Sequence, residues 1–411
     1  MNSPHTPPVS ERITNLKTEN AFVVGVETAA YEKETGKKVM KFYIGQPDFP
    51  TPQNIQLAAI KAIVDGKHGY TPSAGIPELR KAVAEYLSET RHSSYQMEDV
   101  AIGNGAKPFI GYTIQCVTEY GKGHEVLFPN PGFPIYESQT ILNGAVPRPL
   151  MLYEKNKYNF DIDDLGRQMN KNTRLLILNS PHNPTGSVLA HYELNAIYNI
   201  LKKWPDVWVL SDEVYSQLVF DAEFASITHS GYLGMKERTV LLDGASKTYA
   251  MTGWRIGYAA NKHLAKHFGT LITNTTSCPD HIAQWASVEA LTGSQKIPQD
   301  MKRDFLYRRS SIVDGLNDIP GVTCLLPGGA FYAYPNVTEA CKIVGAKNSE
   351  DFRKKLLHEA FVSVTSDTHF GPQVPGDGEH IRFSYAASME DIEEGLSRMK
   401  TWIESYQTEE V

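Results

Sequence analysis

The chain has 411 residues, of which 41% are hydrophobic and 21% charged, a composition typical of a globular protein of two or three domains. The net charge of -7 argues against nucleic acid and anionic membranes as partners, because both select for basic surfaces. The polar N-terminal stretch MNSPHTPPVSER predicts no secretory signal, and no apolar run approaches the roughly 18 residues of a membrane span. Four widely spaced cysteines without a CxxC pair indicate reduced thiols and a cytoplasmic protein, and we predict no metal site.

The first part of the chain is predicted to be mainly helical. Residues 1–10 form a loose arm, and a helix follows over roughly 20–33. KVMKFYIGQPDFPTP (38–52) predicts a short strand and a proline-rich turn. The patterns at 54–66 and 76–89 predict two further helices.

From residue 100 the pattern alternates between strands and helices. Apolar runs without polar alternation are typical of parallel strands that are buried on both faces. These runs are VAIGN (100–104), EVLFPN (125–130), RLLILNS (174–180), VWVLSDE (207–213) and TVLLDG (239–244). Helical segments such as 107–121, with Pro108 in its first turn, and 191–204 lie between them. This order predicts an α/β layer with a doubly wound, mostly parallel sheet.

After about residue 290 the pattern changes to a smaller α+β unit. A charged helix over 299–318 precedes short strands in VTCLLP (322–327), AFYAYP (330–335) and HIRFSYA (380–386), and a last helix covers 391–406. We therefore predict three segments: an N-terminal arm with part of the small domain (1–53), a large domain (54–290) and a small C-terminal domain (291–411).

Polar and charged residues follow the predicted strands. Ligands of open α/β sheets bind outside the carboxyl ends of the strands, so these residues are expected to share one rim. They are Gly105, Ala106, Lys107, Phe133, Asn183, Asp212, Tyr215, Ser246, Lys247 and Arg255. Each also has a structural interpretation: NGAKP and NPTG as turns, Phe133 as core, Asp212 as a helix cap, and the two cations as surface charges. The common rim and the order of the motifs favour a functional site.

The motifs together resemble one family. NPTG, SDEVY and SKTYAMTGWRIGYA (246–259), with GQPDFPTP, GYTPSAGIPELR, GGAFYAYPN and IRFSYA, are similar to the fold type I pyridoxal-phosphate (PLP) aminotransferases of the aspartate aminotransferase class over nearly the whole chain. The resemblance implies a three-layer α/β/α sandwich with a mostly parallel seven-stranded sheet, plus a smaller α+β domain. It also implies transfer of an amino group from an L-amino acid to a 2-oxo acid in ping-pong half-reactions.

The resemblance also implies how the residues hold PLP. Lys247 would form the imine with the cofactor and then act as general base and acid, which needs a lowered pKa. Asp212 would keep the pyridine nitrogen protonated, while Asn183 and Tyr215 would hydrogen-bond the 3′-oxygen and Phe133 would stack on the ring.

The phosphate and the substrate carboxylate would bind at two further places. Arg255, Ser246 and the main-chain amides of Gly105, Ala106 and Lys107 would hold the phosphate. Many relatives carry a serine three residues before the lysine, where this chain has Gly244. Arg382 would bind the substrate α-carboxylate in a two-pronged pair, with Gly45 and Asn183 beside it. Tyr70 would reach the phosphate in a neighbouring subunit, which implies a homodimer with shared active sites.

Lys107 is the clue to the substrate. In one subgroup of the family a lysine at this position binds the distal carboxylate of aspartate or glutamate, and the alternative arginine is absent from NTTSCPDHIAQWA. We therefore favour aspartate or glutamate with 2-oxoglutarate. Glu19 and Ala21 stand where the subgroup has hydroxyl residues, so a Glu19–Lys107 pair, or a lysine that only shapes the cofactor loop, remains an alternative.

Other functions stay open. They are an aminotransferase of aromatic, alanine or prephenate specificity, and a PLP carbon–sulfur β-lyase, since the lysine motif is common to both. A DNA-binding regulator would need a basic helix-turn-helix segment, which is absent before residue 20, and a nicotinamide dehydrogenase would need GxGxxG after a strand.

Overall fold

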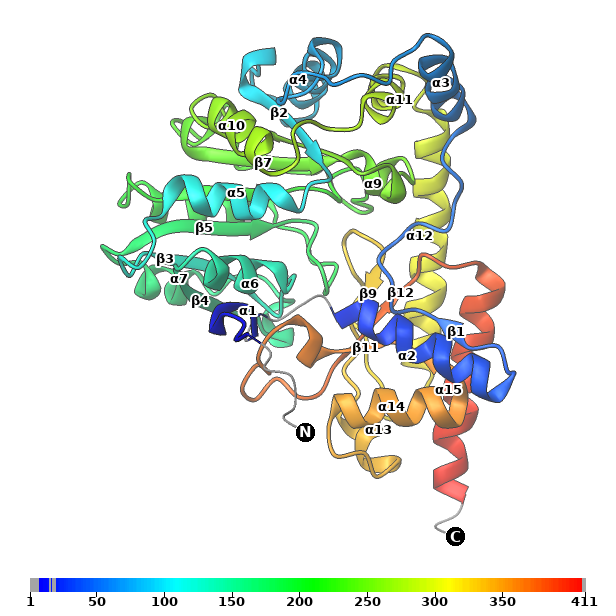
Figure 1. Cartoon of the computed structure of the whole chain (residues 1–411). Helices are drawn as coiled ribbons and strands as arrows, with labels where there is room; N and C mark the ends of the chain where they lie inside the picture. The colour runs from blue at the N-terminus through cyan, green and yellow to red at the C-terminus, as the bar shows by residue number, and fades with distance from the viewer. Residues whose placement is uncertain (1–6, 15, 17–19, 409–411) are drawn as a thin grey trace, which may run out of the picture.

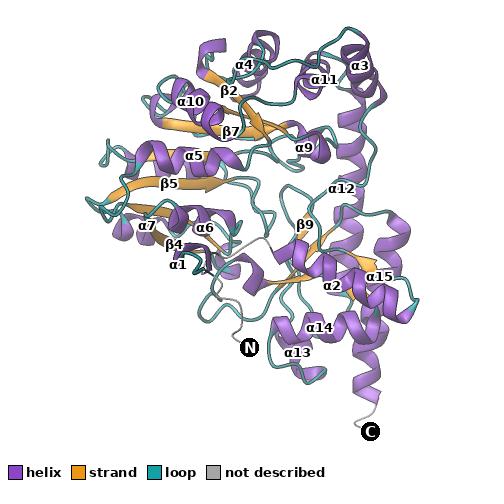
Figure 2. Cartoon of the chain, viewed as in Figure 1, coloured by secondary structure: helices purple, strands orange, loops and turns teal. Residues whose placement is uncertain are grey.

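The computed structural model of the chain describes residues 7–14, 16 and 20–408, and these form two lobes (Figure 1). We call residues 53–292 the sheet lobe, and residues 20–43 with 296–408 the C-terminal lobe. The short helix α1 (Glu11–Thr14) precedes both. The predicted boundaries at residues 53 and 290 stay a prediction, although the change from one layered sheet to smaller sheets falls near them (Figure 2).

A mostly parallel sheet of seven strands forms the centre of the sheet lobe in the described residues. Its strand order is β2-β8-β7-β6-β5-β3-β4, and only β8 runs antiparallel to its neighbours. The strands are β2 (Val100–Asn104), β3 (Glu125–Asn130), β4 (Val146–Met151), β5 (Thr173–Asn179), β6 (Trp208–Asp212), β7 (Thr239–Gly244) and β8 (Ile256–Ala260). All five predicted apolar runs are strands of this sheet.

Helices cover both faces of the sheet, which makes the predicted three-layer sandwich. Side chains of α5 (Pro108–Val117), α6 (Ile135–Leu142) and α10 (Ala265–Thr275) pack on one face. Side chains of α4 (Pro77–Arg91), α7 (Ile162–Gln168), α8 (His191–Leu201) and α11 (His281–Thr292) pack on the other. Outside this layer, α3 (Gln53–Val64) packs on α11.

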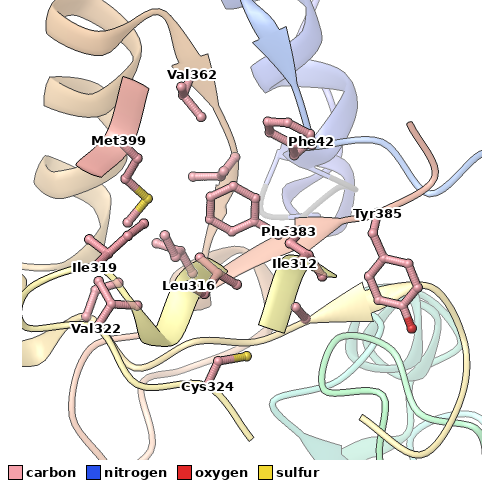
Figure 3. Packing of buried hydrophobic residues seen from close by; sticks show 14 of the residues in the cluster. Phe42, Ile312, Leu316, Ile319, Val322, Cys324, Val362, Phe383, Tyr385 and Met399 are labelled. Carbon is pink, nitrogen blue, oxygen red and sulfur yellow. The ribbon is translucent and has the colours of Figure 1, made fainter. Parts of the chain in front are cut away.

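The C-terminal lobe has its own core. Two small sheets, β1 (Met40–Lys41) with β10 (Val362–Ser363), and β11 (Thr365–Ser366) with β12 (Ile381–Ser384) and β9 (Tyr332–Ala333), lie among helices. The helices are α2 (Asn20–Thr35), α12 (Lys296–Asn317), α13 (Thr338–Ile343), α14 (Ser349–Ala360) and α15 (Met389–Thr408). Figure 3 shows Ile312 and Leu316 of α12 beside Phe383 of β12 and Met399 of α15 in this core.

One predicted strand is wrong. VTCLLP (322–327) forms no strand, and only Thr323 makes an isolated bridge to Asn336. Leu325 and Leu326 are exposed, and Pro327 has no N–H to donate, so the segment cannot continue a ladder. The predicted strands at 330–335 and 380–386 are confirmed in their central residues as β9 and β12.

The long helix α12 runs beside both lobes, as its yellow ribbon shows in Figure 1. Its buried residues Phe305, Ile312 and Leu316 lie on one face at helical spacing and anchor it in the C-terminal core. No helix in the described part of the chain is long and apolar enough to cross a lipid bilayer.

Candidate active site

A cavity of about 440 Å³ opens at the carboxyl ends of the parallel strands. Most of the residues predicted from the sequence line it, and they come from both lobes. They are Gly45, Ala106, Lys107, Phe133, Asn183, Asp212, Tyr215, Ser246, Lys247, Arg255 and Arg382. Gly105 lies next to it, against Arg255, whereas Tyr70 does not line it.

Lys247 extends into the cavity from the short helix α9 (Ala245–Thr248), which begins where β7 ends. Its Nζ donates a hydrogen bond to the backbone oxygen of Gly45, 2.5 Å away. A Cβ at position 45 would overlap the hydroxyl of Tyr332, so glycine is required where the chain passes this close. The lysine amine is therefore held at a fixed place beside the backbone of another segment.

Asp212 ends β6 and is 5% exposed. Tyr136 Oη donates to its Oδ2 at 2.7 Å, while Oδ1 is buried and has no hydrogen-bond partner among the described residues. Burial raises the pKa of Asp212 to about 6, although the hydrogen bonds from Tyr136 and from the Val214 backbone oppose this shift. An unpaired buried carboxylate oxygen of this kind suits a ligand that brings an N–H group.

Arg382 lies on β12 and crosses to the sheet lobe. Its Nη1 donates to Asn183 Oδ1 at 2.8 Å and its Nη2 to the backbone oxygen of Tyr43 at 2.6 Å. The guanidinium carbon lies 4.4 Å from the ring centre of Tyr332 and 4.7 Å from that of Phe370. Its Nε has no hydrogen-bond partner among the described residues. A buried guanidinium with a spare donor at a cavity wall is suited to a carboxylate.

Tyr215 and Tyr332 form a buried pair of hydroxyls. The two Oη atoms are 2.7 Å apart. Burial, followed by the contact with Tyr332, raises the pKa of Tyr215, so its hydroxyl stays protonated near neutral pH. Tyr332 was not among the predicted site residues.

The turn between β2 and α5 lies beside Arg255. Gly105 has φ +87°, and a Cβ there would overlap the Arg255 guanidinium. Arg255 itself has φ +56° and donates from Nη1 to the Thr252 backbone oxygen at 2.8 Å. The Gly105 N–H is already donated to the Gly103 oxygen, also at 2.8 Å, so Ala106 and Lys107 carry the amides that precede α5.

Lys107 lies at the mouth of the cavity between two aromatic rings. Its Nζ is 5.4 Å from the ring centre of Phe133 and 6.0 Å from that of Phe22 in α2. Ala21 is half-buried in the same helix, whereas the predicted contact of Glu19 lies outside the described residues. The lysine thus lies on the cavity wall, near the two aromatic rings.

Two further residues named in the sequence analysis are Gly244, which departs from the family pattern, and the predicted Tyr70. Gly244 is buried against β8, and a Cβ there would lie 3.1 Å from the Cα of Gly257 and from the oxygen of Ile256. A serine at position 244 would therefore press on the neighbouring strand, although Gly244 and Ser246 both line the cavity. Tyr70 is 92% exposed and lies outside the cavity of its own chain.

A buried ionic network lies beside β6, which ends at Asp212, and β7, which leads to Lys247. Arg91, at the end of α4, donates from Nε to Glu213 Oε2 at 2.8 Å and from Nη2 to Asp243 Oδ2 at 2.7 Å. All three side chains are at most 1% exposed. Burial raises the pKa of Asp243 to about 7, and the nearby guanidinium opposes this shift.

Replacing Arg91 with methionine is expected to lower the free energy of unfolding by about 3–5 kcal/mol, because two buried carboxylates lose their counter-ion. Chemical denaturation at one protein concentration measures this difference. Arg303→Met is the matched control, because it removes an exposed ion pair to Asp300, and it should change stability by less than about 1 kcal/mol. Equal losses in both variants would contradict a supporting role for the network.

Comparisons with known proteins agree with this geometry. The family described as Aminotransferase class I and II matches residues 37–399. The chain is 34% identical to an aspartate aminotransferase of Geobacillus stearothermophilus, over 97% of this chain and 99% of the other. It is 35% identical to an asparagine–oxo-acid transaminase of Streptococcus mutans, over 96% and 99%. The crystal structure of the aspartate aminotransferase from Rhizobium meliloti superposes with a TM-score of 0.90 at 31% identity, over 97% and 99%.

The chain belongs to the class I and II aminotransferases. Its cofactor is PLP. The residues of the cavity fit this cofactor: the unpaired Asp212 oxygen can accept from a ring N–H, and the cavity contains a lysine amine. The predicted fold type, enzyme class and cofactor are therefore confirmed.

Two residues of this aminotransferase were missed in the sequence. Tyr136 lies in the first turn of α6 and Tyr332 lies on β9, whereas the residues predicted for the rim follow the apolar runs. The position of Tyr136, three residues after the predicted Phe133, is the only local signal that could have pointed to it. Tyr332 comes from the other lobe, and no local signal links it to Tyr215.

Proposed function

We propose that this aminotransferase exchanges amino groups between aspartate or glutamate and 2-oxoglutarate, with Lys247 moving the proton at the reacting carbon. The observation that carries the proposal is the meeting of the Lys247 amine, the Asp212 carboxylate and the Arg382 guanidinium at one cavity that also contains the Lys107 amine. PLP, when bound, withdraws the electron pair that is left on the substrate Cα when its proton departs.

Lys247 and Asp212 supply the acid–base groups. Lys247 Nζ would take the proton that leaves the substrate Cα and would deliver it to the cofactor carbon C4′, which carries the amino group. The unpaired Oδ1 of Asp212 would accept a hydrogen bond from the cofactor ring nitrogen and would keep that nitrogen protonated. Tyr136 holds the other oxygen of Asp212, so the carboxylate keeps one orientation.

The phosphate end is formed by groups from three segments. The N–H groups of Ala106 and Lys107 stand at the beginning of α5, where the helix dipole favours an anion. Ser246 and Arg255, which line the cavity, would add a hydroxyl and a guanidinium, and Phe133 would lie against the cofactor ring. Gly105 leaves room for Arg255 at this place.

The substrate end is formed around Arg382. Its spare Nε and its Nη groups bind the α-carboxylate, with Asn183 and the backbone of Gly45 beside it. Asn183 and Tyr215, which also line the cavity, would hydrogen-bond the cofactor 3′-oxygen. A second carboxylate on the substrate is bound by Lys107, which lines the same cavity beside Phe133.

Lys107→Ala tests the choice of substrate. We expect kcat/KM for aspartate and glutamate to fall about 10–100-fold, which corresponds to one hydrogen bond between charged groups. For alanine and phenylalanine we expect a change of less than about threefold. Single-turnover half-reactions of the PLP form with one amino acid at a time measure these values, because they avoid the dicarboxylic acceptor.

Lys155→Ala is the matched control, since Lys155 also lies over an aromatic ring, Tyr153, but outside the cavity. Equal losses for all amino acids in Lys107→Ala would contradict a role in substrate choice. Pyruvate and ammonia released from cysteine without an acceptor would instead point to a β-lyase.

We also propose that the enzyme is a homodimer with shared active sites, and that it works in the cytoplasm. Leu57, Ile60 and Ile63 on the outer face of α3 are each more than half exposed, and such an apolar stripe favours a protein partner. Tyr70 follows this stripe, is exposed and does not line its own cavity, so it is available to a second copy, where it would reach the phosphate. The unpaired cysteines fit a reducing compartment.

Mixing subunits tests the sharing of active sites. Lys247→Ala and Tyr70→Ala subunits, each inactive or nearly so alone, should regain about a quarter of the wild-type activity after refolding together. Half of the dimers are then hybrids, and each hybrid has one intact site. A mixture no more active than its parents, or full activity of Tyr70→Ala alone, would contradict shared sites.

A further inference from the structure

The pair Tyr215–Tyr332 joins the two lobes inside the cavity. Tyr215 follows β6 in the sheet lobe, whereas Tyr332 begins β9 in the C-terminal lobe. Their hydroxyl oxygens are 2.7 Å apart, and the residues are 4% and 1% exposed. One hydrogen bond between two neutral hydroxyls uses one proton, so its direction decides where the other proton points.

Charges on the two sides of the pair favour one direction. The Arg382 guanidinium lies 4.4 Å from the ring centre of Tyr332, and a cation at this place favours donation by that hydroxyl. The cation over the Tyr215 ring, the Lys247 amine, lies farther away, at 5.8 Å from the ring centre. Burial and the contact with Tyr332 raise the pKa of Tyr215, and Arg382 lowers it more than Asp212 raises it. Tyr332 is therefore the donor, and the proton of Tyr215 is left for another acceptor.

The backbone fixes the Tyr332 hydroxyl in this place. A Cβ at Gly45 would overlap it, and the oxygen of Gly45 accepts from Lys247. Tyr332 also pairs with Ser384 across β9 and β12, two residues from Arg382. Any shift of β12 that moves Arg382 relative to the sheet lobe therefore also moves Tyr332.

We propose that Tyr332 is a positioning residue of the transamination, whose hydroxyl donates to Tyr215 and directs the Tyr215 proton to the cofactor. The inference rests on the proposed contact of Tyr215 with the cofactor oxygen. A hydroxyl that accepts one hydrogen bond is polarised and becomes a stronger donor in the next. Tyr332 thus links the strand pair that carries Arg382 to the tyrosine that sets the acidity of the bound cofactor.

The test is the pH titration of the cofactor absorbance in the PLP-loaded protein. A hydrogen bond to the cofactor oxygen lowers its affinity for a proton, so a weaker donor raises the pH midpoint. We expect Tyr332→Phe to raise the midpoint by about 0.5–1 pH unit, as for the loss of one buried hydrogen bond. Tyr215→Phe should raise it further, and Tyr332→Phe should add nothing in the Tyr215→Phe background.

Tyr385→Phe is the matched control. Tyr385 also lies in the core of the C-terminal lobe (Figure 3). Its hydroxyl donates to the Ala330 oxygen at 3.1 Å, and the residue does not line the cavity. This variant should leave the midpoint unchanged. A second measurement is the KM for the amino acid, which should stay within about twofold in Tyr332→Phe because the ring beside Arg382 remains.

The possible outcomes separate the claims. A lower pH midpoint in Tyr332→Phe would mean that Tyr215 is the donor of the hydrogen bond. A lower midpoint, or an unchanged one, would overturn the inference if Tyr215→Phe still raises the midpoint. An additional shift in the double variant would mean that Tyr332 acts without Tyr215, which also overturns it. An unchanged pH midpoint in Tyr215→Phe would instead overturn the proposed role of Tyr215, and the inference with it.

Discussion

Lys247→Ala is expected to lower kcat for transamination by about 10⁴-fold or more, because the variant loses both the amine that binds the cofactor aldehyde and the proton carrier at Cα. The amine is held 2.5 Å from the Gly45 oxygen, inside a cavity lined by Asp212 and Tyr215. No other predicted group of the site can replace it: Lys107 lies between the rings of Phe22 and Phe133 at the mouth.

The measurement is the rate of a single half-reaction with aspartate at saturating PLP. Lys262→Ala is the control, because Lys262 is an exposed lysine that follows β8 and does not line the cavity. It should keep the wild-type rate. If Lys247→Ala retained more than about a hundredth of the rate, another residue would have to carry the proton.

Asp212→Asn should have the second largest effect, a loss of about 10²–10³-fold in kcat, since it removes a buried charge that acts on the cofactor ring. The variant keeps the shape of the side chain and the contact with Tyr136, so the loss reports the charge. Half-reaction rates with aspartate measure it. A loss of less than about threefold would contradict the pairing of Asp212 with the ring nitrogen.

We also expect Asp212→Asn to change the thermal stability of the PLP-free protein. Because burial raises the pKa of Asp212 from 3.8 to about 6, the folded protein binds this proton more tightly than the unfolded chain does. The contribution of Asp212 to stability therefore falls as the pH rises from about 4 to about 6. We expect Asp212→Asn to raise the thermal midpoint at pH 8, and this gain should shrink as the pH falls to about 4.

Most of the sheet could be predicted from the sequence, because buried parallel strands have an apolar signal of their own. The five predicted runs are strands with buried residues along their length. Two strands of the sheet, β4 and β8, were missed for different reasons. β4 carries Pro147 and Pro149, which an edge strand tolerates but which weaken the signal. β8 lies inside the segment read as a cofactor motif, where IGYAA is too short to stand out.

The site could be predicted where it depends on order along the chain. The carboxyl ends of the parallel strands place Asn183, Asp212 and Lys247 at one rim, as the topological rule requires. Contacts between the lobes could not be predicted. The bond from Arg382 to Asn183 joins residues 199 positions apart, and the bond from Tyr332 to Tyr215 joins residues 117 apart. Only the packing of the C-terminal lobe on the sheet lobe determines them.

The most direct test is to find the residue that holds the cofactor. Borohydride reduction of the PLP-loaded protein fixes the cofactor onto the lysine that binds it, and trypsin no longer cuts there. Mass spectrometry should then find the label on the peptide of residues 239–255, attached to Lys247. A label on Lys107 or on any other lysine, or no label at all, would contradict the account.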